Sequence, residues 1–242
     1  MSRRDRPSGL ARARSGLAIG AIVILAACGG GGSSITQTPS SPALAAPLVE
    51  GEALDAGRYA LDLDLYMGSS DTLSVTFRIP DGWEAWAYGV VETEGRGDPA
   101  TGRVLGFWIV DEVYADPCRW NRGSIDPPVG PYVHDLVAAL AAQRQRYATT
   151  PRDETLAGYP GEQMQLQVPP TIDFSDCWNS EFHSWTAVPS GGRYHQGPGQ
   201  FDRLWILDVD GTRLVIDAAF FPATSRQDRA ELRQIVGSVR IE

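Results

Sequence analysis

Regular alternation of apolar and polar residues predicts that this chain is built mainly from β-strands. In residues 71–79 every second side chain is apolar, which is the period of a strand with one buried face. Residues 155–168 alternate in the same way around a glycine-rich turn at 158–161 and predict a hairpin. Residues 104–113 and 182–188 are apolar runs that also fit strands.

The clearest local signal is a second hairpin near the C-terminus. The apolar runs 204–209 and 212–221 flank Asp210-Gly211, a dipeptide that two-residue hairpin turns favour. Residues 205–212 also resemble the first motif of the haloacid-dehalogenase-like phosphatases. That motif stands early in its family and relies on a phosphate-binding lysine, whereas here only 30 residues follow and the chain contains no lysine. We therefore interpret the segment as a hairpin.

Two segments have the period of an amphipathic helix. In residues 133–140 apolar side chains recur at spacings of three and four, and Pro131 suits the first position of that helix. Thr224 or Ser225 can cap a second helix, whose apolar stripe lies in residues 232–239. Strands with one central and one C-terminal helix predict an α+β fold, in which both helices flank an antiparallel β-sheet.

The N-terminus has the features of a secretory signal. Five arginines and one acid precede an apolar run at 17–27 that is too short to span a bilayer. Leu-Ala-Ala-Cys at residues 25–28 resembles the lipobox of bacterial lipoproteins. The resemblance implies a signal peptide at 1–27, acylation of Cys28, and anchoring on the extracytoplasmic side of the bacterial cell membrane. The alternative is a plain secretory signal with an incidental Cys28.

Composition divides the remaining chain into a tether and one domain. Residues 28–47 are rich in Gly, Ser, Pro and Ala, which is typical of a flexible linker, and 48–242 form one predicted globular domain. The net charge is −9 for the whole chain, and without residues 1–27 it becomes −13. Such an acidic body excludes binding to a nucleic-acid backbone. The absence of lysine excludes P-loop and pyridoxal chemistry.

Cys118 and Cys177 remain once Cys28 is assigned to the lipid. Two remaining cysteines in an exported domain predict a disulfide. The alternatives are a reactive thiol or a metal pair, although neither cysteine belongs to a Cys-x-x-Cys motif and neither has an adjacent histidine.

This disulfide would bring together two tryptophan-containing loops. Trp120 and Trp178 each lie close to a half-cystine, and Asp116, Arg119 and Asp176 are near them in sequence. Aromatic faces beside carboxylates suit sugars, cations or peptides, so these five residues are candidates for ligand binding. The simpler interpretation is that both rings pack over the disulfide.

His195 is the candidate for acid–base chemistry. It lies in a glycine-rich loop at 191–199, and a site that combines it with Asp202 or Arg203 is conceivable. The chain has no Gly-x-Ser-x-Gly motif, no zinc signature and no cofactor motif, so we expect no cofactor and no metal.

One further resemblance concerns the whole domain. Residues 77–83 read Phe-Arg-Ile-Pro-Asp-Gly-Trp and look like the entry of Mog1/PsbP-like domains, and the closing hairpin and helix up to 239 are also similar. The resemblance implies an antiparallel sheet flanked by helices, used for binding or assembly and not for catalysis. It assigns no catalytic residue. The segment 116–131 and the two cysteines depart from the pattern of that family.

These observations predict a lipid-anchored extracytoplasmic binding or partner-interaction domain without catalysis. Its expected partners are the membrane, through the lipid on Cys28, and a small molecule or a protein. The alternative is an extracytoplasmic hydrolase that uses carboxylates and His195.

Overall fold

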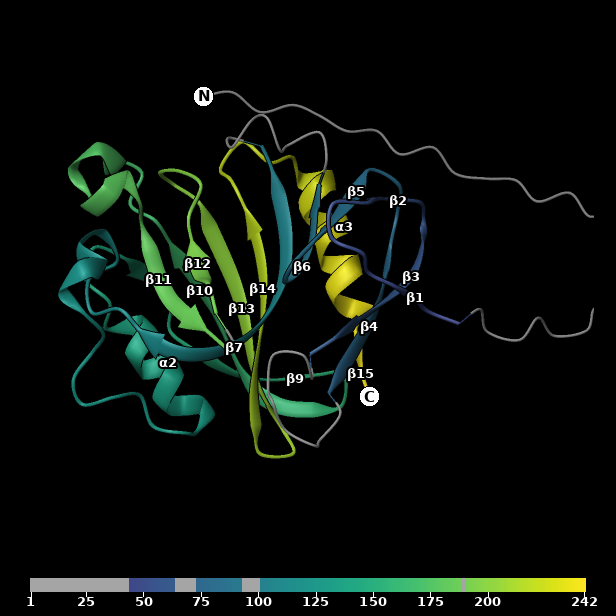
Figure 1. The fold of residues 1–242 in the computed structure, drawn as a ribbon, viewed down its shortest axis with the longest axis horizontal. Coiled ribbons are helices and arrows are strands. Elements are labelled where there is room, and N and C mark those ends of the chain that lie inside the picture. The colour runs from purple at the N-terminus through teal and green to yellow at the C-terminus, as the bar shows by residue number, and fades with distance from the viewer. Residues whose placement is uncertain (1–43, 64–72, 93–100, 189) are drawn as a thin grey trace, which may run out of the picture. The chain divides into compact units, whose positions relative to one another are not determined.

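An antiparallel sheet organises the chain in the computed structural model, which describes residues 44–63, 73–92, 101–188 and 190–242 (Figure 1). Eight strands follow one another across it. In spatial order they are β2 (Ala53–Leu54), β5 (Trp83–Trp86), β6 (Gly89–Glu92), β7 (Arg103–Val113), β14 (Thr212–Phe220), β13 (Phe201–Val209), β10 (Tyr159–Gln167) and β8 (Tyr147–Ala148). The expected strands at 104–113, 155–168 and 204–221 are confirmed.

A smaller sheet lies beside the first. It consists of β1 (Ala46–Pro47), β3 (Gly57–Asp62), β4 (Ser74–Ile79) and β15 (Arg240–Ile241). Only β1 and β3 pair in parallel, and the other pairs are antiparallel. Ala46 and Pro47 therefore belong to a strand, although the sequence assigned them to the tether.

Three short strands extend the main sheet. β9 (Arg152–Leu156) pairs with β10, and β11 (His183–Ala187) pairs with both β7 and β12 (Gly192–Tyr194). The expected loop at 191–199 therefore contains a strand. A Cβ at Gly192 would clash with the backbone carbonyl of Trp185, so the same glycine that suggested a loop permits this close pairing.

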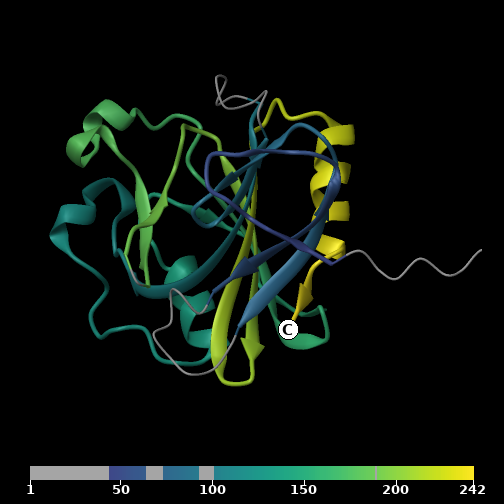
Figure 2. The same ribbon diagram turned by 45° about the vertical axis from the view of Figure 1, so that its right-hand side comes forward.

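Two helices cover opposite faces of the sheet. Leu136 of α2 (Val133–Ala141) belongs to the same buried cluster as Val215, whereas Leu232 of α3 (Arg226–Gly237) belongs to the cluster that contains Ile216. Because consecutive strand residues point to opposite faces, Val215 and Ile216 serve different cores. Figure 2 shows β13 and β14 between the two helices. The predicted α+β fold is confirmed.

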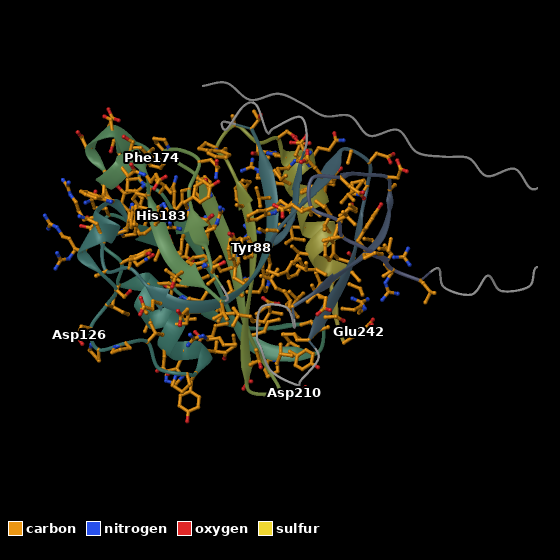
Figure 3. The ribbon with its side chains drawn as sticks, in the orientation of Figure 1. Tyr88, Asp126, Phe174, His183, Asp210 and Glu242 are labelled. Atoms are coloured by element: carbon orange, nitrogen blue, oxygen red, sulfur yellow. A yellow bond between two sulfur atoms is a disulfide. The ribbon has the colours of Figure 1, made fainter. Side chains whose placement is uncertain are left out.

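Local signals set the ends of these elements. Ser225 caps α3 by accepting a hydrogen bond from the backbone N–H of Asp228 at 3.1 Å, as expected. Asp210 and Gly211 have φ values of 51° and 90°, as the predicted hairpin turn requires, and Asp210 marks its tip (Figure 3). The prediction that Pro131 opens the first helix is wrong, because the helix begins at Val133.

A disulfide joins two segments at the edge of the fold. Cys118 lies in the 3₁₀-helix η2 (Pro117–Arg122), and Cys177 lies between η3 (Phe174–Asp176) and η4 (Trp178–Ser180). The predicted pairing is confirmed, with the two Cα atoms 4.5 Å apart. Within the described segments, no helix is long and apolar enough to cross a membrane.

Removing this disulfide should destabilise the fold. The bond closes a loop of 59 residues, and loss of that constraint on the unfolded chain costs about 4 kcal/mol. We expect the double variant Cys118→Ala/Cys177→Ala to show this loss in urea unfolding. A difference below about 1 kcal/mol would mean that the loop is held by its other contacts.

Candidate functional site

The disulfide brings together the two tryptophan-containing segments, as expected, and the two tryptophans have different surroundings. The indole Nε1–H of Trp120 donates to the backbone carbonyl of Trp178 at 3.3 Å. The Trp120 ring stacks instead on His183, with ring centroids 4.6 Å apart, and Trp178 remains 50% exposed. These contacts use Trp120 for packing and leave Trp178 as the more accessible ring.

The charged candidates beside the disulfide have mainly local roles. Asp116 accepts hydrogen bonds from the backbone N–H groups of Cys118 and Arg119, both at 3.1 Å, and so caps the start of η2. Arg119 and Asp176 are exposed. Their assignment to a ligand site therefore stays a prediction.

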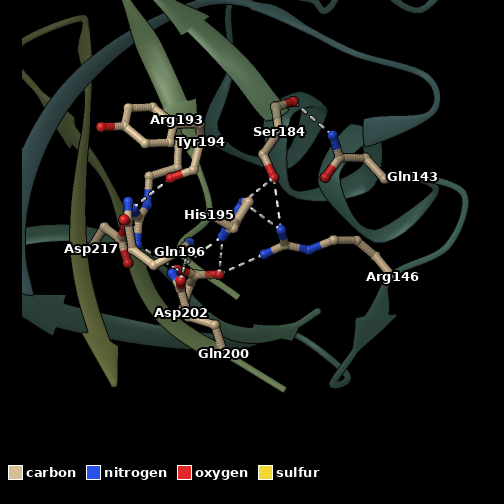
Figure 4. Close-up of polar contacts among 10 residues, drawn as sticks. All are labelled: Gln143, Arg146, Ser184, Arg193, Tyr194, His195, Gln196, Gln200, Asp202 and Asp217. Atoms are coloured by element: carbon tan, nitrogen blue, oxygen red, sulfur yellow. Dashed lines mark hydrogen bonds and ion pairs between the residues drawn. The ribbon is translucent and has the colours of Figure 1, made fainter. Parts of the chain in front are cut away.

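His195 directly follows β12 and lies in a buried network of polar side chains (Figure 4). Its Nε2 is 2.7 Å from the hydroxyl of Ser184, and its Nδ1 is 3.3 Å from Oδ2 of Asp202. The structure thus brings His195 and Asp202 together, as the sequence suggested. It adds Ser184, which carries no sequence signal beyond its place in the apolar run at 182–188.

Arg146 closes this line of side chains. One guanidinium nitrogen lies 2.7 Å from both Ser184 Oγ and His195 Nε2, and the other pairs with Asp202 Oδ2 at 2.7 Å. Burial, together with the positive charges of Arg146 and Arg193, lowers the pKa of His195 well below its ordinary value despite the attraction of Asp202. His195 is therefore neutral and accepts the Arg146 hydrogen bond at Nε2.

A second ion pair continues the network. Arg193 donates to Asp202 Oδ1 at 2.8 Å, and its Nε lies 2.6 Å from Asp217 Oδ2. Burial raises the pKa of Asp217 to about 7, with the charge of Asp202 acting in the same direction and Arg193 opposing it. Burial also acts to raise the pKa of Asp202, but the charges of Arg193 and Arg146 and the hydrogen bond from Gln200 outweigh it and lower the pKa.

The distances between Ser184, His195 and Asp202 resemble those of a catalytic triad, but a substrate in solution has no access to these side chains. The side chains of Ser184, His195 and Asp202 have no solvent exposure. A nucleophile must reach a substrate atom, and a general base needs a pKa near the working pH. The network instead stabilises the packing of β11, β12 and β13 against the segment that carries Arg146.

A pocket of about 200 Å³ adjoins the network at Arg193. Aromatic and apolar side chains form much of its lining. The lining residues are Trp86, Val91, Gly102, Arg103, Val104, Trp108, Gly192, Arg193, Tyr194, Gln196 and Phe221. We call this space the aromatic pocket.

The aromatic pocket has buried donors without partners. The indole Nε1–H groups of Trp86 and Trp108 are both buried, and neither has a hydrogen-bond partner among the described residues. Their rings are held in place by each other and by Tyr88, at centroid distances of 5.6, 5.3 and 4.4 Å. No carboxylate lines this pocket in the described chain, and the unpartnered indole N–H groups of its lining tryptophans favour a ligand with a hydrogen-bond acceptor.

Sequence reasoning missed this pocket. Trp108 lies in the apolar run at 104–113 and is only 1% exposed, but it also lines a cavity. Trp86 carried no signal because β5 is only four residues long. No group of three or more His, Cys, Asp or Glu side chains is placed to hold a metal ion in the segments that the structure describes.

Comparisons with known proteins place the chain in no family. No family model matches it, and no curated protein matches it. Among solved structures, cyanobacterial PsbP (CyanoP) from Synechocystis sp. PCC 6803 is similar over 80% of this chain and 97% of its own, with 12% identity and a TM-score of 0.35. The Mog1/PsbP-like resemblance therefore stays a prediction.

The buried carboxyl of Asp217 should leave a mark on the pH dependence of stability. The folded chain keeps a proton on Asp217 up to pH about 7, whereas an unfolded aspartate releases it near pH 4. Between these values the folded state binds more protons, so this group lowers the free energy of unfolding as the pH rises. We expect Asp217→Asn to remove that decline in urea unfolding measured from pH 4 to 8.

Asp111→Asn serves as the control, because Asp111 is an exposed aspartate on β7. It should show the same decline as the unmodified chain. Parallel pH curves for all three proteins would mean that Arg193 keeps Asp217 ionised throughout.

Proposed function

We propose that this chain is a lipid-anchored, extracytoplasmic binding domain without catalysis, whose ligand is a small planar molecule with a hydrogen-bond acceptor. One observation carries the proposal: Trp86 and Trp108, which line the aromatic pocket, have buried indole N–H groups without a hydrogen-bond partner among the described residues. A buried donor without a partner loses about 1–3 kcal/mol, and a ligand acceptor recovers part of it. The flat rings favour a flat ligand.

The alternative of a hydrolase is favoured by the line Ser184–His195–Asp202. It is opposed by the complete burial of all three side chains and by Arg146, which contacts both Ser184 Oγ and His195 Nε2. A serine-directed fluorophosphonate should therefore fail to label the folded chain. Labelling that disappears in Ser184→Ala would establish the hydrolase instead.

Two observations support placement outside the cytoplasm. The lipobox-like residues 25–28 fit acylation of Cys28, and the Cys118–Cys177 disulfide fits an oxidising compartment. A tether of about twenty residues would let the domain move some 25 Å from its lipid.

Acylation of Cys28 is directly testable. We expect the chain expressed in a bacterium to incorporate labelled palmitate and to sediment with membranes. Cys28→Ser should lose both properties, because no other cysteine can take the lipid while Cys118 and Cys177 form a disulfide. Release of an unlabelled wild-type chain into the soluble fraction would indicate a plain secretory signal.

Ligand binding is best followed through the indole N–H resonances in ¹H–¹⁵N NMR spectra of the purified full-length chain in detergent. We use coumarin as a planar carbonyl probe and naphthalene as its counterpart without an acceptor. Coumarin should shift the resonances of Trp86 and Trp108. Trp108→Phe keeps a ring but removes one donor, so we expect about 5-fold weaker binding.

Trp178→Phe is the matched control at the disulfide junction and should leave the affinity for coumarin unchanged. A larger effect of Trp178→Phe than of Trp108→Phe would move the ligand to that junction. Equal binding of naphthalene and coumarin would refute the role of the free N–H groups.

A further inference from the structure

The opposite face of the sheet carries a second cleft, of about 340 Å³, between α3 and β13. Four arginines line it, and its remaining lining is mostly apolar and aromatic. The arginines are Arg203, Arg226, Arg229 and Arg233. The aromatic residues are Phe201, Trp205 and Phe220, and no carboxylate among the described residues lines the cleft. We call it the arginine cleft.

Helix α3 separates its charges. The carboxylates of Asp228 and Glu231 form ion pairs with the guanidinium of Arg103, at 3.7 and 2.8 Å, and do not line the cleft. Arg226, Arg229 and Arg233 are spaced by three and four residues and therefore share the other side of the helix. The acids of α3 are thus used elsewhere, and its cations face the cleft.

None of the four cleft arginines forms an ion pair with a carboxylate in the described chain. Arg203 donates a hydrogen bond to a neutral group, Gln165 Oε1, at 3.4 Å. Burial lowers the pKa of Arg203, and the positive charges of Arg233, Arg152 and Arg229 lower it further. Like charges are therefore concentrated here, in a chain whose mature net charge is −13. An anion would relieve this repulsion.

We propose that the arginine cleft binds a phosphomonoester that carries a ring. A phosphomonoester has a charge of −1.5 to −2 near pH 7 and three acceptor oxygens, which suits several planar guanidinium donors better than a single carboxylate does. The cleft has room for more than phosphate alone.

The aromatic lining accounts for the ring. Phe201 and Phe220 stack with centroids 5.2 Å apart, and the Arg229 guanidinium lies over Phe220 at 5.7 Å. Trp205 is half-buried on β13, two residues from Arg203 on the same face of the strand. A ring on the ligand would cover these apolar faces while its phosphate meets the arginines.

Calorimetric titration of the purified full-length chain tests the proposal with three probes. Phenyl phosphate combines ring and dianion, phenylacetate keeps the ring with one charge, and inorganic phosphate lacks the ring. We expect phenyl phosphate to bind at least about 10-fold more tightly than either of the others, and to weaken as sodium chloride is raised. No measurable binding of phenyl phosphate at millimolar concentration overturns the proposal.

Arg226→Gln/Arg233→Gln is the decisive variant, because both side chains are exposed and their loss leaves the core intact. It should weaken phenyl phosphate binding at least about 10-fold. Arg122→Gln/Arg144→Gln removes the same charge from exposed positions outside the cleft and should change the affinity less than 2-fold. An equal loss of phenyl phosphate affinity in both double variants would mean that binding depends on net charge alone, and would overturn the proposed site.

The two binding proposals fail separately. Trp108→Phe should leave phenyl phosphate binding unchanged, and the cleft variant should leave coumarin binding unchanged. If inorganic phosphate binds as tightly as phenyl phosphate, the proposed role of the ligand's ring is wrong, whereas anion binding by the cleft is supported. Loss of phenyl phosphate binding in Trp108→Phe would place the probe in the aromatic pocket and overturn the assignment to the cleft.

Discussion

Asp202 has no solvent exposure, and four side chains converge on its two carboxylate oxygens. Arg146 and His195 meet one oxygen, while Arg193 and Gln200 meet the other. A buried carboxylate is tolerated only when its charge is neutralised and its lone pairs are satisfied. Because its partners come from separate segments, the position of this one charge fixes how β12 and the chain before β8 lie against β13. The same ion pair positions Arg193, which also lines the aromatic pocket.

The chain uses arginine and no lysine, which allows positive charges to be kept in the buried network. A lysine loses its proton readily when it is buried, whereas a guanidinium stays charged and can hold two groups at once. Arg193 does so between Asp202 and Asp217, and Arg103 does so between Glu92 and Glu231. The same residue type, left without carboxylates, produces the arginine cleft. Buried ion pairs and an open cationic surface thus differ only in where the acids are placed.

Local rules predicted much of the fold. Period-two alternation predicted β4 and β10, and an apolar run predicted β7. The Asp210-Gly211 dipeptide predicted the closing hairpin, and Ser225, one of the two residues proposed as a cap, is the residue that caps α3. These features depend on neighbours in sequence. Composition and compartment were enough to predict the disulfide, which is a long-range contact.

The candidate sites were harder to predict because they depend on long-range contacts. Ser184 and Arg146 reach His195 only after β11 and the segment before β8 are folded. The arginines of α3 were readable as a helix face, but the sequence does not show that Asp228 and Glu231 turn away to Arg103. Trp86 and Trp108 are far apart along the chain, and only the pairing of β5, β6 and β7 makes their rings adjacent.

The alternation of β13 has an evolutionary consequence. Asp202 and Arg203 are consecutive, yet one side chain belongs to the buried network and the other to the arginine cleft. A single-residue insertion or deletion upstream in this strand would exchange the two faces, burying an arginine among apolar residues and exposing the aspartate. Descendants of this gene can therefore gain or lose codons in the connecting loops, while β13 must keep its length and the alternation of its side chains between the two faces of the sheet.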